Sequence, residues 1–145
     1  MMKLIYSFLT LLVISGCVTN AYYIENSNLP VSETRKAVTT VIGKPRVISL
    51  NGRELSSVYH DQKFEPLEDD KKVKSRYYTK VIILGPRRPY EISVQVNKEM
   101  FDAQTTTFVD VGLDENLSKR KAIEIKKALS KGLENYQNVD GENPF

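Results

Sequence analysis

Two consecutive segments with the periodicity of β-strands constrain the fold most. From Tyr90 to Asn97 the residues alternate between apolar and polar in the order Y-E-I-S-V-Q-V-N. A strand has this period of two when one face of its sheet is buried and the other meets solvent. The preceding segment, residues 73–84, is rich in β-branched and aromatic residues, and a Gly- and Pro-containing turn over residues 85–89 separates the two. We therefore expect a long antiparallel hairpin with one solvated face.

A second, shorter hairpin is predicted upstream. Asn51-Gly52 stands between two strand-like runs, residues 46–50 and 53–60. Asn-Gly in this setting is the strongest local signal for a type I′ turn with a two-residue loop. That loop pairs Ile48 with Leu55, so we expect both side chains on the inner face of the sheet.

Two further segments have helical periodicity. Residues 30–42 place apolar side chains at i, i+3 and i+4, and Gly43 and Pro45 then end the pattern. Asp114 is the predicted N-cap of a second helix that runs to about Tyr136. Each helix is apolar on one side only, so we expect both helices to cover a single face of the sheet.

These elements together predict an α+β fold. A loop over 98–104 and a further strand over 105–111 complete the order of elements. The expected architecture is an antiparallel sheet of four to five strands with two helices packed on one face. We expect one domain over 29–136, followed by a disordered polar tail over 137–145.

The N-terminal segment has the pattern of a secretory signal peptide. A basic start at Lys3 precedes a nearly unbroken apolar run over residues 4–14, followed by Ser15, Gly16 and Cys17. A helix of about 11 residues covers roughly half of a 30 Å hydrocarbon core, so we do not expect a permanent membrane span. The four residues Ile14-Ser15-Gly16-Cys17 resemble the lipobox of bacterial lipoprotein precursors.

The resemblance implies a processing route that ends in a lipid anchor. In that family the cysteine thiol takes a diacylglycerol, a peptidase cuts between the residues that correspond to Gly16 and Cys17, and a fatty acid such as palmitate acylates the new amine. Residues 1–16 would then be the signal peptide and 17–28 a lipidated tether, within which Tyr22, Tyr23 and Ile24 could dock on the domain as a short edge strand. Two or more acyl chains make membrane anchoring stable. The alternative is an ordinary secretory signal with a chance cysteine at the cut site.

The residue after the lipidated cysteine influences sorting in the lipoprotein family. Here it is Val18, not the aspartate associated with retention in the inner membrane. The expected location is therefore the cell envelope, with the protein lipid-anchored in the outer membrane and facing the periplasm.

Composition argues against several other classes of function. Once Cys17, the only cysteine, is acylated, no thiol remains for a disulfide or for cysteine catalysis. The single histidine, His60, precedes Asp61, but no nucleophile signature accompanies the pair. The acidic residues over 65–70 lack the spacing and the glycine of a calcium loop. We expect no catalytic residues, no metal and no cofactor, and a net charge of +3 does not predict nucleic-acid binding.

Basic residues at two places form a candidate binding surface. They are Arg87 and Arg88 in the predicted turn, and Lys126, Lys127 and Lys131 on the second helix. Such a surface would meet anionic lipid head groups or an acidic partner. The alternative is a solvated helix face, because Glu124 and Glu134 are interleaved with the lysines.

The order of the predicted elements is similar to that of small lipoproteins that serve outer-membrane assembly machines. The similarity lies in the order alone and transfers no functional residue. It implies a non-catalytic accessory or scaffold that binds another envelope protein, through the open face of the sheet or through the charged loop 61–72. In that loop we expect Phe64 and Leu67 at the tip.

The rival interpretation is a module that holds a lipid or small molecule between sheet and helices. It requires a large internal cavity. The aromatic residues expected to line that cavity are Tyr77, Tyr78, Tyr90 and Phe108.

The lipid anchor can be tested at its cysteine. We expect Cys17→Ala to abolish labelling by radioactive palmitate and to release the protein from the membrane fraction, because no other thiol can accept the diacylglycerol. Palmitate labelling that persists in Cys17→Ala would refute the anchor.

Overall fold

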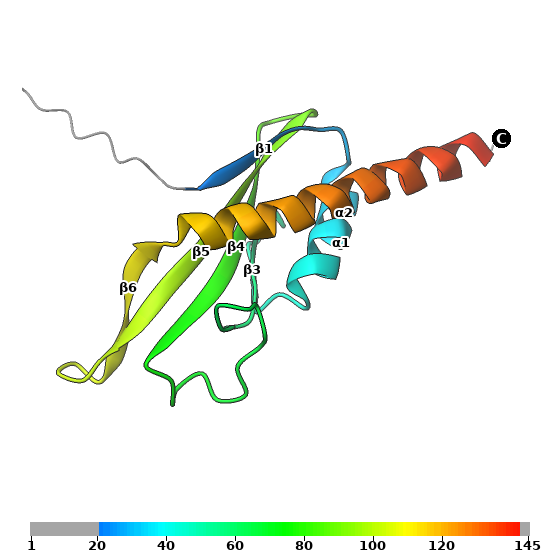
Figure 1. Ribbon diagram of the computed structural model, residues 1–145. Coiled ribbons are helices and arrows are strands. Elements are labelled where there is room, and N and C mark those ends of the chain that lie inside the picture. The colour runs from blue at the N-terminus through cyan, green and yellow to red at the C-terminus, as the bar shows by residue number, and fades with distance from the viewer. Residues whose placement is uncertain (1–20, 143–145) are drawn as a thin grey trace, which may run out of the picture.

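The fold has two layers, a six-stranded antiparallel sheet and two helices on one of its faces (Figure 1). The computed structural model describes residues 21–142, so the predicted signal peptide, Cys17 and residues 143–145 lie outside the described residues. The expected α+β class is confirmed, with one strand more than the four to five expected.

The central strand of the sheet is β5. The elements are β1 (Tyr22–Ser27), α1 (Val31–Ile42), β2 (Val47–Ile48), β3 (Glu54–Ser56), β4 (Ser75–Leu84), β5 (Tyr90–Asp102), β6 (Thr107–Leu113) and α2 (Glu115–Glu142). The strand order is β1-β5-β4-β3-β2, and β6 also pairs with β5. Because β4 occupies one side of β5 along residues 91–100, β1 and β6 share the other side: β1 pairs with residues 90–94 and β6 with residues 97–102.

The core lies between the sheet and the two helices, as the alternation in the sequence predicts. The inward positions of β4 and β5 are buried and meet one side of each helix. The main core cluster consists of Ile24, Leu29, Ala37, Val38, Val81, Ile83, Ile92, Val94, Ala122, Ile125 and Leu129. The helices approach closely at Gly132, where an added Cβ would lie 3.3 Å from the Leu29 Cδ1 atom and 3.6 Å from the Ala37 Cβ atom.

Strand β1 corrects the predicted start of the domain. Residues 22–27 are an edge strand of the sheet, with Tyr22 opposite Val94 and Ile24 opposite Ile92. Ile24 is buried in the core. The sheet therefore begins at residue 22, and most of the predicted tether over 17–28 belongs to the folded domain. Pairing with β1 satisfies backbone groups of β5 that would otherwise form an open edge.

Two boundaries toward the C-terminus are also corrected. The predicted loop over 98–104 is wrong for its first five residues, because β5 continues to Asp102 and pairs with β4 and β6. The predicted disordered tail is wrong for residues 137–142, because α2 continues to Glu142. Residues 137–142 extend a helix that already exists, so each of them adds a backbone hydrogen bond as it is ordered. Starting a new helix there would be far less favourable.

The short hairpin has the predicted register but a different turn. Ile48 pairs with Leu55. The turn is closed by the Gly52 N–H, which donates to the Ser49 carbonyl at 2.9 Å, and of the Asn-Gly pair only Gly52 has a positive φ, 68°. A type I′ turn needs positive φ at both residues. Leu55 is buried, but Ile48 is 51% exposed, so the expected inner pair is buried on one side only.

The core can be tested with two isoleucines of one helix. We expect Ile125→Ala to lower the free energy of unfolding by about 2–5 kcal/mol, because Ile125 is fully buried and its loss leaves a cavity. Ile123→Ala is the matched control, since Ile123 is 59% exposed and its loss should change stability by less than about 0.5 kcal/mol. Urea unfolding followed by circular dichroism measures both, and equal losses would contradict this packing.

Candidate binding surface on the open face of the sheet

The face of the sheet that points away from the helices carries an aromatic–arginine stack. We use this name for Arg46, Tyr59, Arg76, Phe101 and Phe108, which come from the segments before β2 and after β3 and from β4, β5 and β6. The inward positions of β4 are its buried odd-numbered residues, so Arg76 lies on the opposite face. The register then brings Glu99 beside Arg76 and Phe108 beside Phe101.

Arg76 is the centre of the stack. Its guanidinium carbon lies 3.7 Å from the ring centroid of Tyr59 and 3.8 Å from that of Phe108. Its Nε donates a hydrogen bond to the Glu99 carboxylate at 2.6 Å, and its side chain is 14% exposed. Stacking on two rings and a charge-assisted hydrogen bond together hold the guanidinium in one orientation.

Arg46 supplies the accessible charge of the stack. This exposed side chain lies over the Tyr59 ring, with 4.4 Å between the guanidinium carbon and the ring centroid. Tyr59 in turn meets Tyr78 edge to face at 6.0 Å. Burial, followed by the nearby carboxylates of Asp110 and Glu99, raises the pKa of the Tyr78 hydroxyl, which stays protonated. Within the described part of the chain no carboxylate forms an ion pair with Arg46.

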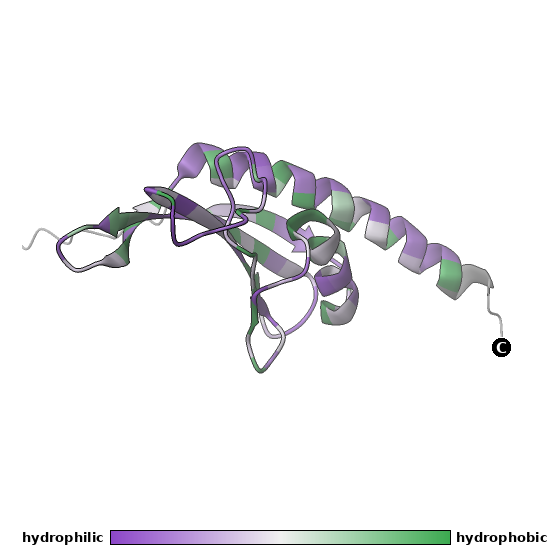
Figure 2. Cartoon of the chain, turned by 90° about the horizontal axis from the view of Figure 1, so that it is seen from below, coloured by the Kyte–Doolittle hydropathy of each residue, from purple (hydrophilic) through white to green (hydrophobic). Residues whose placement is uncertain are grey.

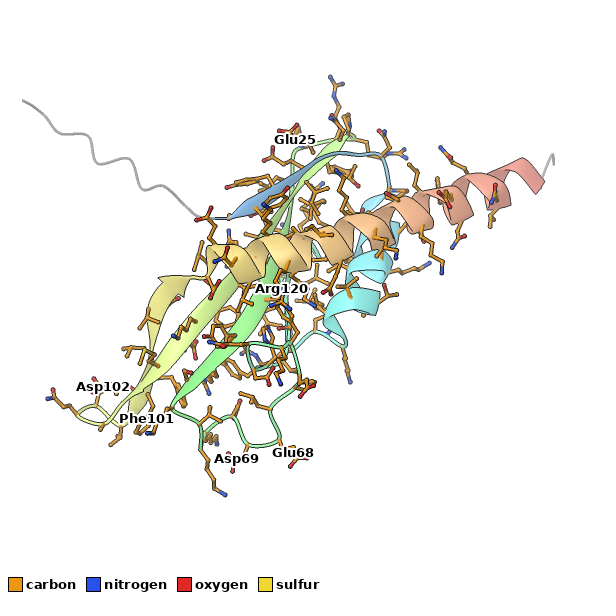
Figure 3. The ribbon with its side chains drawn as sticks, viewed as in Figure 1. Glu25, Glu68, Asp69, Phe101, Asp102 and Arg120 are labelled. Carbon is orange, nitrogen blue, oxygen red and sulfur yellow. The ribbon has the colours of Figure 1, made fainter. Side chains whose placement is uncertain are left out.

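Apolar side chains extend the surface to the end of the β5–β6 hairpin. The Phe101 and Phe108 rings lie 5.5 Å apart, and Phe101 is 42% exposed. Met100 and Val109, a cross-strand pair, are also exposed, but the alternation of β5 places them on the opposite side of the hairpin from Phe101. Figure 2 shows hydrophobic residues on this hairpin, and Figure 3 shows Phe101 at its end, away from α2. Neither helix covers this part of the sheet.

The buried side-chain amide of Asn97 lies on the same open face. The outward positions of β5 are its odd-numbered residues, and Asn97 stands opposite Tyr78 of β4 and Leu113 of β6. Its Nδ2 is buried and has no hydrogen-bond partner among the described residues. A buried amide without a partner costs free energy, so its neighbours must hold it there through packing.

The chemistry of this surface is that of recognition. Tyrosine, phenylalanine and arginine are enriched at protein interfaces, and tyrosine and arginine recur among the residues that contribute most binding energy. A planar guanidinium such as that of Arg46 matches the geometry of a carboxylate. The surface can therefore bind a partner that combines apolar and acidic groups.

The basic residues singled out in the sequence do not form one surface. Arg87 and Arg88 lie in the exposed β4–β5 turn, where Arg88 donates to the Asn28 carbonyl at 3.3 Å. On α2, Lys126 and Lys131 point roughly 140° apart, at 100° per residue. Lys126 lines a hollow beside β1, and Lys131 lines a groove between the helices. Lys127 is exposed and lines neither hollow.

Sequence reasoning missed the aromatic–arginine stack. Its members are spread over residues 46–108, and no spacing connects them. The available signal was the outward position of Arg76 and Tyr78 in a strand whose other face is apolar. Side chains of this type on the solvated face of a strand indicate a surface with packing of its own.

His60 and Asp61 do not form a catalytic dyad. His60 is 4% exposed, and its Nδ1 meets the backbone carbonyl of Asp61 at 2.8 Å, not the carboxylate. A carbonyl only accepts, so Nδ1 carries the proton, and Nε2 accepts from the Thr79 hydroxyl at 3.0 Å. The Asp61 carboxylate accepts from the backbone N–H groups of Glu65 and Lys63, and these hydrogen bonds lower its pKa.

The charged loop 61–72 differs from its expected form. Phe64 does not stand at an exposed tip; it packs against Tyr77, Val96 and Leu117, and the Lys121 ammonium lies 3.9 Å from its ring centroid. Leu67 is half-buried, so the expected pair of exposed apolar residues is wrong. In the described residues no group of three His, Cys, Asp or Glu side chains could hold a metal ion.

A hollow in the described part of the chain lies between the helices and not between the helices and the sheet. It is a groove of about 660 Å³. The expected aromatic lining is divided, because Tyr77 is buried on the helix side of the sheet and Tyr78 and Phe108 lie on the open face. The groove is lined by Glu33, Lys36, Ala37, Thr40, Ala128, Lys131, Gly132, Asn135, Tyr136 and Val139.

Comparison of the chain with models of known protein families and with curated proteins finds no match. Of the helices in residues 21–142, none is long and apolar enough to cross a membrane.

The burial of His60 predicts a pH dependence of stability. Burial, followed by repulsion from Lys121, lowers the pKa of His60 below its ordinary value of 6.5, against the opposing hydrogen bond to Asp61. Below pH 6.5 the unfolded chain therefore binds a proton that the folded chain binds less readily. The free energy of unfolding should fall with decreasing pH by at most about 1.4 kcal/mol per pH unit, until the pH passes the lowered pKa.

His60→Gln is the variant that isolates this effect, because His60 is the only histidine. We expect the difference in unfolding free energy between the wild type and His60→Gln to shrink as the pH falls from 8 to 5, measured by urea unfolding. A difference that stays constant over this range would show that His60 does not titrate as described.

Proposed function

We propose that this chain is a periplasm-facing, membrane-anchored lipoprotein that acts as a non-catalytic accessory or scaffold. It binds another cell-envelope protein through the aromatic–arginine stack. One observation carries the proposal: the helices cover one face of the sheet, and the other face presents the stacked Arg76 with the exposed Phe101 and Arg46 beside it. The anchor rests on the lipobox Ile14-Ser15-Gly16-Cys17.

The rigidity of the stack supports binding to a protein. Arg76 is already held by Tyr59, Phe108 and Glu99, so little side-chain freedom is lost when a partner docks. The exposed Phe101 offers apolar area, and the exposed guanidinium of Arg46 adds electrostatic selectivity for an acidic group.

The alternative function is binding of a lipid or small molecule. The apolar part of the groove between α1 and α2, with Ala128, Gly132 and Tyr136, favours it. The fully buried side chains of Val38, Val81 and Ile125 count against a ligand between sheet and helices.

Crosslinking and pull-down from membranes test the proposal. We expect the wild-type protein to capture an envelope protein, and Phe101→Ala and Arg46→Ala each to reduce the yield about 5- to 30-fold, as loss of a dominant contact does. Leu50→Ala and Arg87→Ala are the matched controls, because both residues are exposed in turns away from the stack.

Quantitative mass spectrometry of the captured proteins provides the readout. Recovery of no envelope protein by the wild type would contradict the scaffold function. Equal recovery by the stack variants and the control variants would show that the partner binds elsewhere.

A further inference from the structure

We propose that the domain lies edge-on against an anionic lipid bilayer and meets it through one flank, which we call the β1–α2 flank. This flank consists of Tyr22 and Tyr23 at the start of β1 and of Lys119, Ile123 and Lys126 on α2. The inference rests on the lipid anchor proposed above and adds to it the surface of the protein that the bilayer contacts.

The length of chain between the anchor and the sheet limits the orientation. Tyr22 follows Cys17 by five residues, so the two Cα atoms are at most roughly 18 Å apart in a fully extended chain. A helix of the length of α2, Glu115–Glu142, spans about 42 Å. The tether therefore holds the start of β1 close to a membrane that holds Cys17, whereas it sets no such limit on the far end of α2.

The side chains around that point suit a bilayer interface. Tyr22 stands opposite the inward-facing Val94, and Tyr23 opposite the outward-facing Ser93, so the two exposed rings lie on either side of the same sheet edge. Tyrosine is enriched at membrane–water interfaces, because its ring is apolar and its hydroxyl is polar.

Helix α2 contributes a stripe of basic and apolar side chains beside β1, which also suits a bilayer interface. Lys119, Ile123 and Lys126 are spaced at i, i+4 and i+7, so they lie along one side of α2. This side is next to β1, because Lys126 lines a hollow together with Ile24 and Glu25. Figure 3 shows Glu25, the acidic residue of this hollow, on β1.

The two lysines of the stripe are available to lipid phosphates. Within the described residues neither Lys119 nor Lys126 forms an ion pair with a carboxylate. Ile123 between them is 59% exposed. Apolar and basic groups side by side are the pattern of a surface that inserts shallowly among anionic head groups. In the edge-on position the aromatic–arginine stack stays accessible to a protein partner.

Single introduced cysteines test this orientation in the lipidated, full-length mature protein. The chain has one cysteine, so after acylation an added cysteine is the only free thiol. Ile123→Cys reports on the flank, and Leu50→Cys, fully exposed in the β2–β3 turn at the opposite side of the sheet, is the reference. Each variant is placed in vesicles of phosphatidylethanolamine and phosphatidylglycerol, and the rate of labelling by a membrane-impermeant maleimide is measured.

We expect Ile123→Cys to react about five-fold more slowly than Leu50→Cys in vesicles, because the interface shields it, and at the same rate in detergent. Adding Lys119→Glu and Lys126→Glu to the Ile123→Cys chain should remove the protection. The matched pair Lys44→Glu and Lys71→Glu, exposed in loops outside α2, should not.

The outcomes separate this inference from the proposed anchor. If the protein floats with the vesicles but Ile123→Cys and Leu50→Cys react equally fast, the anchor stands and the orientation is refuted. If the protein without an added cysteine is itself labelled at Cys17 and does not float with the vesicles, the proposed anchoring is refuted.

Discussion

The backbone pairing of β5 is the interaction on which the rest of the structure depends. β4 pairs with it at ten consecutive positions, from Ser75↔Met100 to Leu84↔Glu91, and β1 and β6 divide its other side. A strand paired along both sides has its backbone groups satisfied, so its side chains define two separate faces. Ile92, Val94 and Val96 fill the helix-covered face, and Glu99 and Phe101 belong to the open one.

The ion pair between Arg76 of β4 and Glu99 of β5 explains how charged residues can occupy largely buried positions in these two strands. Each of the two side chains lies on the open face and is largely shielded from water. Removing two charges from water is costly, and the cost is offset only where geometry and further contacts are good. The 2.6 Å hydrogen bond and the two flanking rings of Tyr59 and Phe108 supply those contacts. The open face is thus ordered without a helix to cover it.

The two faces of the sheet and its edge at β1 have different roles. The face toward α1 and α2 provides stability, the open face carries the proposed protein-binding stack, and the edge at β1 carries the proposed membrane contact. An edge and a face of one sheet are roughly perpendicular. A membrane contact at the edge therefore does not block the stack, and the same domain can hold both contacts at once.

Local patterns in the sequence determined much of this fold. Alternation over residues 90–97 predicted a strand with one buried face, the helical periodicity predicted two one-sided helices, and the short hairpin has its predicted Ile48–Leu55 register. The residues Ile14-Ser15-Gly16-Cys17, which resemble a lipobox, are also a local pattern, and they predict the proposed anchor without reference to the fold.

Only the tertiary structure decided the continuation of β5 to Asp102, the recruitment of residues 22–27 as an edge strand, and the aromatic–arginine stack. In each case the stabilising partner is distant in the sequence: Glu99 meets Arg76, and Tyr22 meets Val94. The interactions that ordered these segments are hydrogen bonds and stacking between distant residues. Periodicity shows which side of an element is buried, but not which distant residues contact it.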